Sequence, residues 1–173
     1  KDIIFYNADI HGNAIVKSRM QVLKRLAERK PLTVVVSLDA GMDRLIPMQV
    51  FMNHIVTLHE GDTLELEPFL RTLVRLGYER QGQVEAPGDF AVRGGIIDIY
   101  PLTEETPFRI DLWGDEIDTI RSFDVTNQRS IERVPSLTIY PATEFVLTEE
   151  QMAAGTARIR KECEKTDAAL KKQ

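Results

Sequence analysis

The sequence has little cysteine and no long apolar run, and each shortage excludes a class of protein. Because Cys163 is the single cysteine among 173 residues, neither an internal disulfide nor a zinc site built from cysteines can form. No apolar run approaches the roughly 20 residues of a transmembrane helix. Lys1–Tyr6 lacks the organisation of a signal peptide. We therefore expect a globular protein of the reducing cytoplasm that does not enter a membrane.

A phosphate-binding loop is also absent, which argues against a self-contained NTPase. No stretch fits GxxxxGK[ST], whose backbone amides and lysine cradle the phosphates of ATP. Asp115–Asp118 resembles the DExD box of helicases, but Gly114 precedes it where an apolar strand is required, so a solvated hairpin turn is favoured. Gly94-Gly95 lacks the third glycine of a dinucleotide loop, so a turn or bulge is expected. We expect no cofactor in this chain.

The remaining candidate motifs do not form a catalytic or metal-binding site. Ser37–Gly41 lacks the first glycine of a nucleophile elbow and is typical of a strand end that leads into a helix N-cap. The three histidines, His11, His54 and His59, have no metal-ligand spacing. His54 and His59 flank a predicted strand five residues apart, hence on opposite faces. We predict no catalytic residue and no metal site.

The distribution of charge divides the chain into three parts. Residues 1–62 carry 8 basic and 7 acidic groups, and residues 148–173 carry 6 and 5. Residues 63–147 carry 8 basic against 15 acidic groups, and all eight basic residues there are arginine. This boundary in composition indicates a separate module. Its net charge of −7 argues against a nucleic-acid-binding module, because such affinity comes mostly from cationic contacts to phosphate.

Residues 1–62 have the pattern of an incomplete α/β domain. Apolar residues at helical spacing predict a helix over Asn13–Arg29. Short helices are predicted at Asp39–Leu45 and Pro47–Asn53, and strands at Asp2–Tyr6, Leu32–Ser37 and Ile55–Leu58. The β-branched run at Leu32–Ser37 is typical of a strand buried on both faces of a parallel sheet. Such a sheet needs more strands than 62 residues supply.

Residues 63–147 predict an α+β module, a helix on a mostly antiparallel sheet. The helix covers Glu67–Leu76 and ends at Gly77, a residue suited to the C′ position. Gly114-Asp115 is the expected centre of a tight hairpin. Strands are predicted at Tyr78–Arg80, Gln83–Glu85, Phe90–Arg93, Ile96–Tyr100, Phe108–Trp113, Glu116–Phe123 and Ser136–Tyr140.

Residues 148–173 predict one helix. Thr148–Gln151 forms a capping box, and a thin apolar stripe from Met152 to Leu170 recurs at spacings of four and three. Two interpretations remain open. The helix is either a lone surface helix or packs on a surface from outside this sequence, and the second is favoured.

Two arginines of the middle module are candidates for partner contacts. Arg80 and Arg93 lie on neighbouring predicted strands. One interpretation pairs them with Glu79, Glu85 or Asp89 at the surface, where such pairs stabilise little. The other makes them anchors of an interface, since arginine is over-represented among interface hot spots. Spacing alone favours the first.

Ordered blocks of the sequence resemble a known family. They are Leu76–Arg80, Gly88–Pro101, Phe108–Asp111, Gly114–Asp118 and Ile139–Phe145. This region is similar to the N-terminal region of bacterial transcription-repair coupling factors and, more distantly, to the B subunit of the UvrABC excision nuclease. Gly94–Pro101 and Gln128–Ser130 favour the coupling factors.

The resemblance implies a division into three domains. Residues 1–62 would be part of a degenerate helicase-like domain 1a. Residues 63–147 would be domain 2, the module that binds UvrA. Residues 148–173 would be the helix that begins domain 1b. The ATP- and magnesium-dependent translocase motor and the contacts to RNA polymerase and DNA would lie in other parts of the parent protein.

The resemblance also implies which residues contact UvrA. By motif they are Arg80, Arg93 and, beside the closing proline, Tyr100. Where the nuclease subunit has an arginine two residues before Arg93, this chain has Ala91, so that contact is absent or replaced. A core aromatic is the alternative role for Tyr100. The resemblance implies a docking fragment of a coupling factor that recruits UvrA to a stalled polymerase; a fragment of the nuclease subunit is the alternative.

Overall fold

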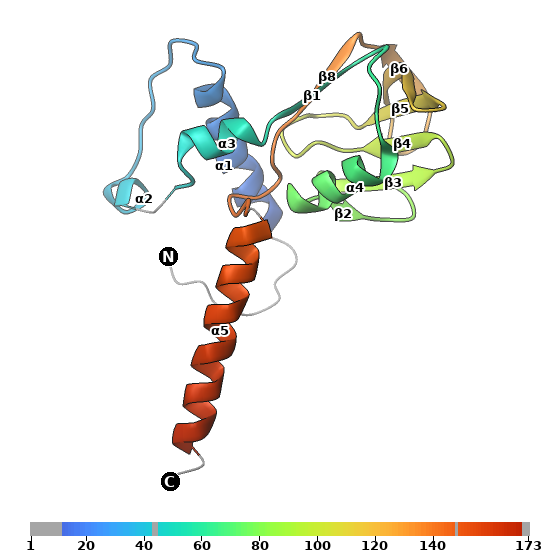
Figure 1. The fold of residues 1–173 in the computed structure, drawn as a ribbon. Coiled ribbons are helices and arrows are strands. Elements are labelled where there is room, and N and C mark those ends of the chain that lie inside the picture. The colour runs from blue at the N-terminus through green and yellow to red at the C-terminus, as the bar shows by residue number, and fades with distance from the viewer. Residues whose placement is uncertain (1–11, 43–44, 148, 171–173) are drawn as a thin grey trace.

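The computed structural model describes residues 12–42, 45–147 and 149–170, and combines a mostly antiparallel sheet with five helices in these ranges (Figure 1). The helices are α1 (Gly12–Ala27), α2 (Leu38–Met42), α3 (Met48–Asn53), α4 (Leu66–Arg75) and α5 (Glu149–Leu170). The strands are β1 (Val56–His59), β2 (Glu79–Arg80), β3 (Asp89–Arg93), β4 (Ile96–Ile99), β5 (Phe108–Trp113), β6 (Glu116–Phe123), β7 (Ser130–Arg133) and β8 (Ser136–Ile139).

Six of the strands form one sheet in the order β2-β3-β4-β5-β6-β7. Only the edge pair β2–β3 is parallel. Two hairpins are closed by two-residue turns, since Arg93 pairs with Ile96 and Trp113 pairs with Glu116. Gly94 and Gly114 begin these turns at φ of 60° and 65°, which glycine adopts without strain. The turn predictions at both glycines are confirmed.

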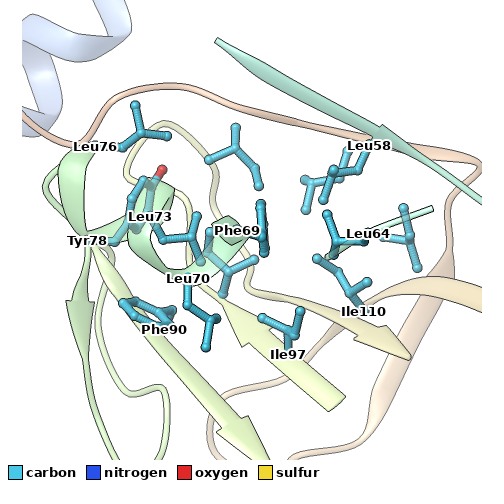
Figure 2. Close-up of a cluster of buried hydrophobic side chains, with 14 of the residues drawn as sticks. Leu58, Leu64, Phe69, Leu70, Leu73, Leu76, Tyr78, Phe90, Ile97 and Ile110 are labelled. Carbon is cyan, nitrogen blue, oxygen red and sulfur yellow. The ribbon is translucent and has the colours of Figure 1, made fainter. Parts of the chain in front are cut away.

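Helix α4 covers one face of this sheet and supplies much of the main core (Figure 2). Leu70 and Leu73 of α4 are buried in one cluster with Phe90, Ile97 and Ile110 of the sheet. Burial of a large aliphatic or aromatic side chain contributes about 1.5–3 kcal/mol. The prediction of a helix packed on a mostly antiparallel sheet is therefore confirmed.

A second, two-stranded ladder joins β1 to β8 in antiparallel register, from Val56–Ile139 to His59–Ser136. The strand predicted at Ile55–Leu58 is confirmed as β1, and its partner among the described residues is β8, which follows the large sheet in sequence. The ladder crosses the expected domain boundary at residue 62. The buried side chains of Leu58 and Leu137 tie it to the main core.

Helices α1 and α3 pack together on a smaller cluster at the end of the sheet unit. Met20 and Leu23 of α1 are buried with Phe51 of α3 and with Leu102 and Tyr140 from loops of the sheet unit. Arg19 binds the Glu144 carboxylate through both Nε and Nη2, and Lys24 Nζ donates to Glu104 at 2.6 Å. The helix predicted over Asn13–Arg29 is confirmed, and it is docked onto the sheet unit.

Two predicted strands are absent from the described residues. Leu32–Ser37 is irregular and exposed, with Val35 92% accessible, because no neighbouring strand of the described chain pairs with it. Gln83–Glu85 is also irregular, since the Asp89 carboxylate accepts the backbone N–H groups of Glu85 and Ala86 and closes a turn. Strand β7, which the sequence did not predict, has only Ile131 as an apolar residue and is exposed throughout.

Helix α5 extends away from the rest of the molecule (Figure 1). Met152 and Ile159 of the predicted apolar stripe are exposed along it, 52% and 67% accessible. The expected strand at Asp2–Tyr6 and the Thr148 cap lie outside the described residues. In the part of the chain that the structure describes, no helix has the length and apolar character needed to cross a bilayer.

Candidate partner-binding surface

The face of the large sheet opposite α4 is built around a buried carboxylate. Along β4, Ile97 and Ile99 point into the α4 core, so Asp98 between them points to the other face. Its side chain is only 1% exposed. A buried carboxylate is costly unless cations and hydrogen bonds compensate it. Asp98 therefore requires the arginines that surround it.

Arg109 of β5 is the principal partner of Asp98. The two residues are directly opposite in the β4–β5 ladder. Arg109 donates from Nε to Asp98 Oδ1 at 2.6 Å and from Nη2 to Oδ2 at 2.8 Å, the two-pronged geometry that arginine gives with carboxylates. Its guanidinium also lies 4.6 Å from the centre of the Phe123 ring. Hydrogen bonding to Asp98 raises the pKa of Arg109 above its ordinary value.

Arg93 is the more accessible partner of the same carboxylate. It ends β3, and its Nη2 donates to Asp98 Oδ2 at 2.6 Å. The side chain is 49% exposed, and this is its single hydrogen bond to the described residues. The predicted pairing with Glu79, Glu85 or Asp89 is wrong, because strand register places Asp98 within reach instead. Arg93 thus keeps donors free for a carboxylate from outside the chain.

Tyr100 lies on the same face as Arg93 but is held by its own domain. It follows β4 and packs on Val84, Ala91 and Phe123. Its hydroxyl donates to the carbonyl of Glu105 at 2.8 Å. Burial, and the nearby Glu105 charge, raise the pKa of Tyr100. The ring therefore has a structural role here, and only part of it is accessible to a partner.

Arg80 lies on the other face. In the parallel β2–β3 pair Arg80 aligns with Phe90, whose side chain belongs to the α4 core. Arg80 accordingly lines a groove of about 580 Å³ together with Val74 of α4 and Phe145 after β8. Its side chain has no ion pair with the described residues. The structure brings Arg93 and Tyr100 together on one face and separates Arg80 from them.

Several contacts on the Arg93 face were not predicted from the sequence. Arg121 of β6 pairs with Asp111 of β5, which also accepts a hydrogen bond from Thr119 at 2.8 Å. The signal was the alternation Arg109-Ile110-Asp111, which puts both charged residues on the face opposite Ile110. This alternation does not identify the partners of Arg109 and Asp111, because those depend on the strand register.

The helicase-like and glycine motifs behave as turns. Asp115 lies with Gly114 in the β5–β6 turn, and Asp115 and Asp118 are exposed. Ser37 accepts the N–H of Ala40 at 3.3 Å, so it caps α2 as expected, although no strand precedes it. His54 and His59 bind Val50 and Asp62 respectively and do not approach a common site.

Comparisons with known proteins agree with this architecture. The UvrB interaction domain family matches residues 56–145, just over half of the chain, a range that contains α4 and all eight strands. The transcription-repair-coupling factor of Bacillus subtilis is 41% identical over 141 residues, which is 82% of this chain and 12% of that protein. The coupling factor of Staphylococcus aureus (strain USA300) is 38% identical over 150 residues, 87% of this chain and 13% of that protein.

A relative that is not a coupling factor has a comparable identity to this chain. UvrABC system protein B of Thermosipho africanus is 39% identical over 167 residues, which is 96% of this chain and 25% of that protein. The chain therefore spans between about an eighth and a quarter of the length of these relatives. Because the family match covers the complete sheet and its helix, the chain belongs to the UvrB interaction domain family.

Proposed function

We propose that this chain is the UvrA-docking part of a transcription-repair coupling factor, which recruits UvrA to stalled RNA polymerase in nucleotide excision repair in the cytoplasm. The observation that carries the proposal is the family match over residues 56–145. That range is the unit that presents Arg93 and its neighbours on the sheet face opposite α4. The names of the relatives, which are repair proteins, support the same role.

The chemistry of the docking surface follows from Arg93. Its guanidinium is held at one end by the buried Asp98 carboxylate and is half-exposed at the other. A fixed, partly solvated guanidinium can grip a partner carboxylate through two parallel hydrogen bonds at a small cost in side-chain entropy. UvrA is accordingly expected to present Asp or Glu at this position, and association should slow as salt rises.

A calorimetric titration of the chain with purified UvrA tests the proposal. The Arg93→Ala variant should lose roughly 2 kcal/mol of binding free energy, the scale of a hot spot. Arg80→Ala tests the second predicted contact in the same way. Arg158→Ala, which removes an exposed arginine of α5, is the matched control and should bind like the parent. Absence of any binding between the parent chain and UvrA would refute the proposal.

The remaining parts of the parent are proposed from its relatives. Residues 1–62 would belong to a helicase-like domain 1a and residues 148–173 would begin domain 1b, with domain 2 over 63–147. The similarity extends beyond the matched domain to 96% of the chain in one relative, which supports this division. ATP and magnesium would act in the motor of the parent, and RNA polymerase and DNA would bind outside this chain.

A fragment of the UvrABC system B subunit is the alternative, favoured by the 39% identity to the Thermosipho protein. UvrA docking would be retained under either assignment, but coupling to RNA polymerase would not. The sequence of the full-length parent protein, read from its gene, distinguishes the two assignments. A GxxxxGK[ST] loop before residue 1 would support the nuclease subunit, and a polymerase-binding region without such a loop would support the coupling factor.

A further inference from the structure

The last residue of β5 exposes the largest side chain of the sheet. Trp113 is the single tryptophan of the chain and is 84% accessible. It belongs to none of the buried clusters, and its indole makes no hydrogen bond with the described residues. An isolated exposed apolar residue needs no explanation, so the role of Trp113 is decided by the residues beside it.

Strand register places Trp113 on the face that carries Arg93. Ile110 and Leu112 of β5 pack in the α4 core, so Asp111 and Trp113 alternate to the other face. The bulge in this hairpin falls on β6, where Asp118 is skipped between the pairs Asp111–Thr119 and Leu112–Ile117. The alternation along β5 is therefore uninterrupted.

The β3–β4 turn brings the two side chains to the same end of the sheet. Arg93 pairs with Ile96, and Ile96 pairs with Asp111, two residues before Trp113. The turn contacts β5 directly, since Leu112 N–H donates to the carbonyl of Gly95 at 2.8 Å. A Cβ on Gly95 would lie 3.1 Å from the carbonyl oxygen of Leu112, and one on Gly94 would meet nothing within 4 Å. The turn therefore places no side chain over this corner.

We propose that Trp113 is the apolar anchor of the UvrA-docking surface, inserted into an apolar pocket of UvrA that has a carboxylate on the side facing Arg93. This inference rests on the proposed function and deepens it. Tryptophan and arginine are, with tyrosine, the residue types enriched among binding hot spots. Burial of an indole that is solvated in the free chain gains a large apolar area, and few rotamers have to be fixed.

The charges around Trp113 favour a protein as the occupant. Asp115, Glu116 and Asp118 are exposed in and after the adjacent turn. Their carboxylates would repel the phosphates of a nucleic acid, whose binding depends on cationic contacts. On a protein surface the same carboxylates can face basic residues at the rim of the pocket.

The test compares three single variants of the full 173-residue chain in titrations with purified UvrA. Trp113→Ala should weaken binding about 30-fold or more and Trp113→Phe by less, because the phenyl ring retains part of the apolar area. Ile159→Ala removes an exposed apolar side chain, 67% accessible, from α5, which contains none of the predicted UvrA contacts. It should change affinity less than twofold. Thermal unfolding should be the same for all three variants, since neither side chain is buried.

Each outcome decides a separate claim. If the parent does not bind UvrA, the proposed function fails and the inference fails with it. If the parent binds and Trp113→Ala binds equally well, the inference is overturned while the docking function stands. A loss with Ile159→Ala but not with Trp113→Ala would place the apolar anchor on α5 and overturn the inference. As a direct check, 5-fluorotryptophan labels Trp113 alone; its fluorine resonance should shift on addition of unlabelled UvrA, and an unmoved resonance would contradict burial.

Discussion

Asp98 shows how one buried charge determines the roles of its neighbours. Three hydrogen bonds from two arginines reach its carboxylate, yet Arg109 is largely buried and Arg93 half-exposed. Arg109 therefore stabilises the fold, while Arg93 keeps donors for a partner. The sequence identified Arg93 and Tyr100 as candidates, and the structure places them on one face. The sequence alone did not predict that Arg80 lies on the other face. The β2–β3 register, which aligns Arg80 with Phe90, cannot be deduced from the spacing of nearby residues.

The first prediction separates the two arginines by stability. Arg109→Ala should lower the free energy of unfolding by about 3 kcal/mol, because it leaves a buried carboxylate with one half-exposed cation. Arg93→Ala should cost less than about 1 kcal/mol, since Arg109 still binds both carboxylate oxygens and an exposed pair is screened by water. Urea unfolding measures both. Equal losses would show that Asp98 depends on both arginines alike.

At the scale of single elements, local patterns succeeded where the element is stabilised locally. Helix α4 and the two glycine hairpins were predicted because their apolar period and turn residues lie within a few positions. The strand prediction at Leu32–Ser37 was wrong, because a strand requires a hydrogen-bonded neighbour and β-branched composition alone does not supply one. Strand β7 was not predicted, because its sequence contains a single apolar residue. The strand forms because it pairs with β6.

The end of α4 gives a prediction at this scale. Gly77 has φ of 90°, and a Cβ there would approach the side chain of Thr143 to 2.6 Å. Gly77→Ala therefore combines a left-handed backbone with a steric clash and should destabilise the fold by about 2 kcal/mol or more. Gly82→Ala is the control, because Gly82 has no positive φ and a Cβ there meets nothing within 4 Å. Comparable melting temperatures for the two variants would contradict this account.

Across the whole molecule, contacts between distant parts of the sequence connect the regions that composition separates. The β1–β8 ladder pairs residues before and after the large sheet. Helix α1 then docks on the loops of that unit through Met20, Leu23 and its ion pairs with Glu104 and Glu144. None of these contacts is visible in local sequence, because each joins segments about 80 or more residues apart.

The chain as a whole should neither bind nor hydrolyse ATP. The reason is the absence of a GxxxxGK[ST] loop from the sequence, without which backbone amides and a lysine cannot cradle the phosphates. Calorimetric titration with Mg-ATP should show no heat above that of dilution. Saturable heat at micromolar nucleotide would instead establish a nucleotide site in this chain and would overturn the assignment of ATP chemistry to the rest of the parent.

Limited proteolysis should show residues 56–145 as the most resistant unit. Residues 31–42 are exposed throughout and lack regular structure before α2, and the described side chains of α5 are almost all exposed, so both segments should be cut first. Because β1 pairs with β8, the resistant core should begin before Val56 and not near Gly61. A cut within residues 32–42 should leave α1 associated with the core, since Met20 and Leu23 are buried against Leu102 and Tyr140. Mass spectrometry of the digest under native and denaturing conditions distinguishes an associated α1 from a released one. Immediate release of α1, or cleavage within β3–β6 at the same rate as within 31–42, would show that these contacts do not hold the unit together in solution.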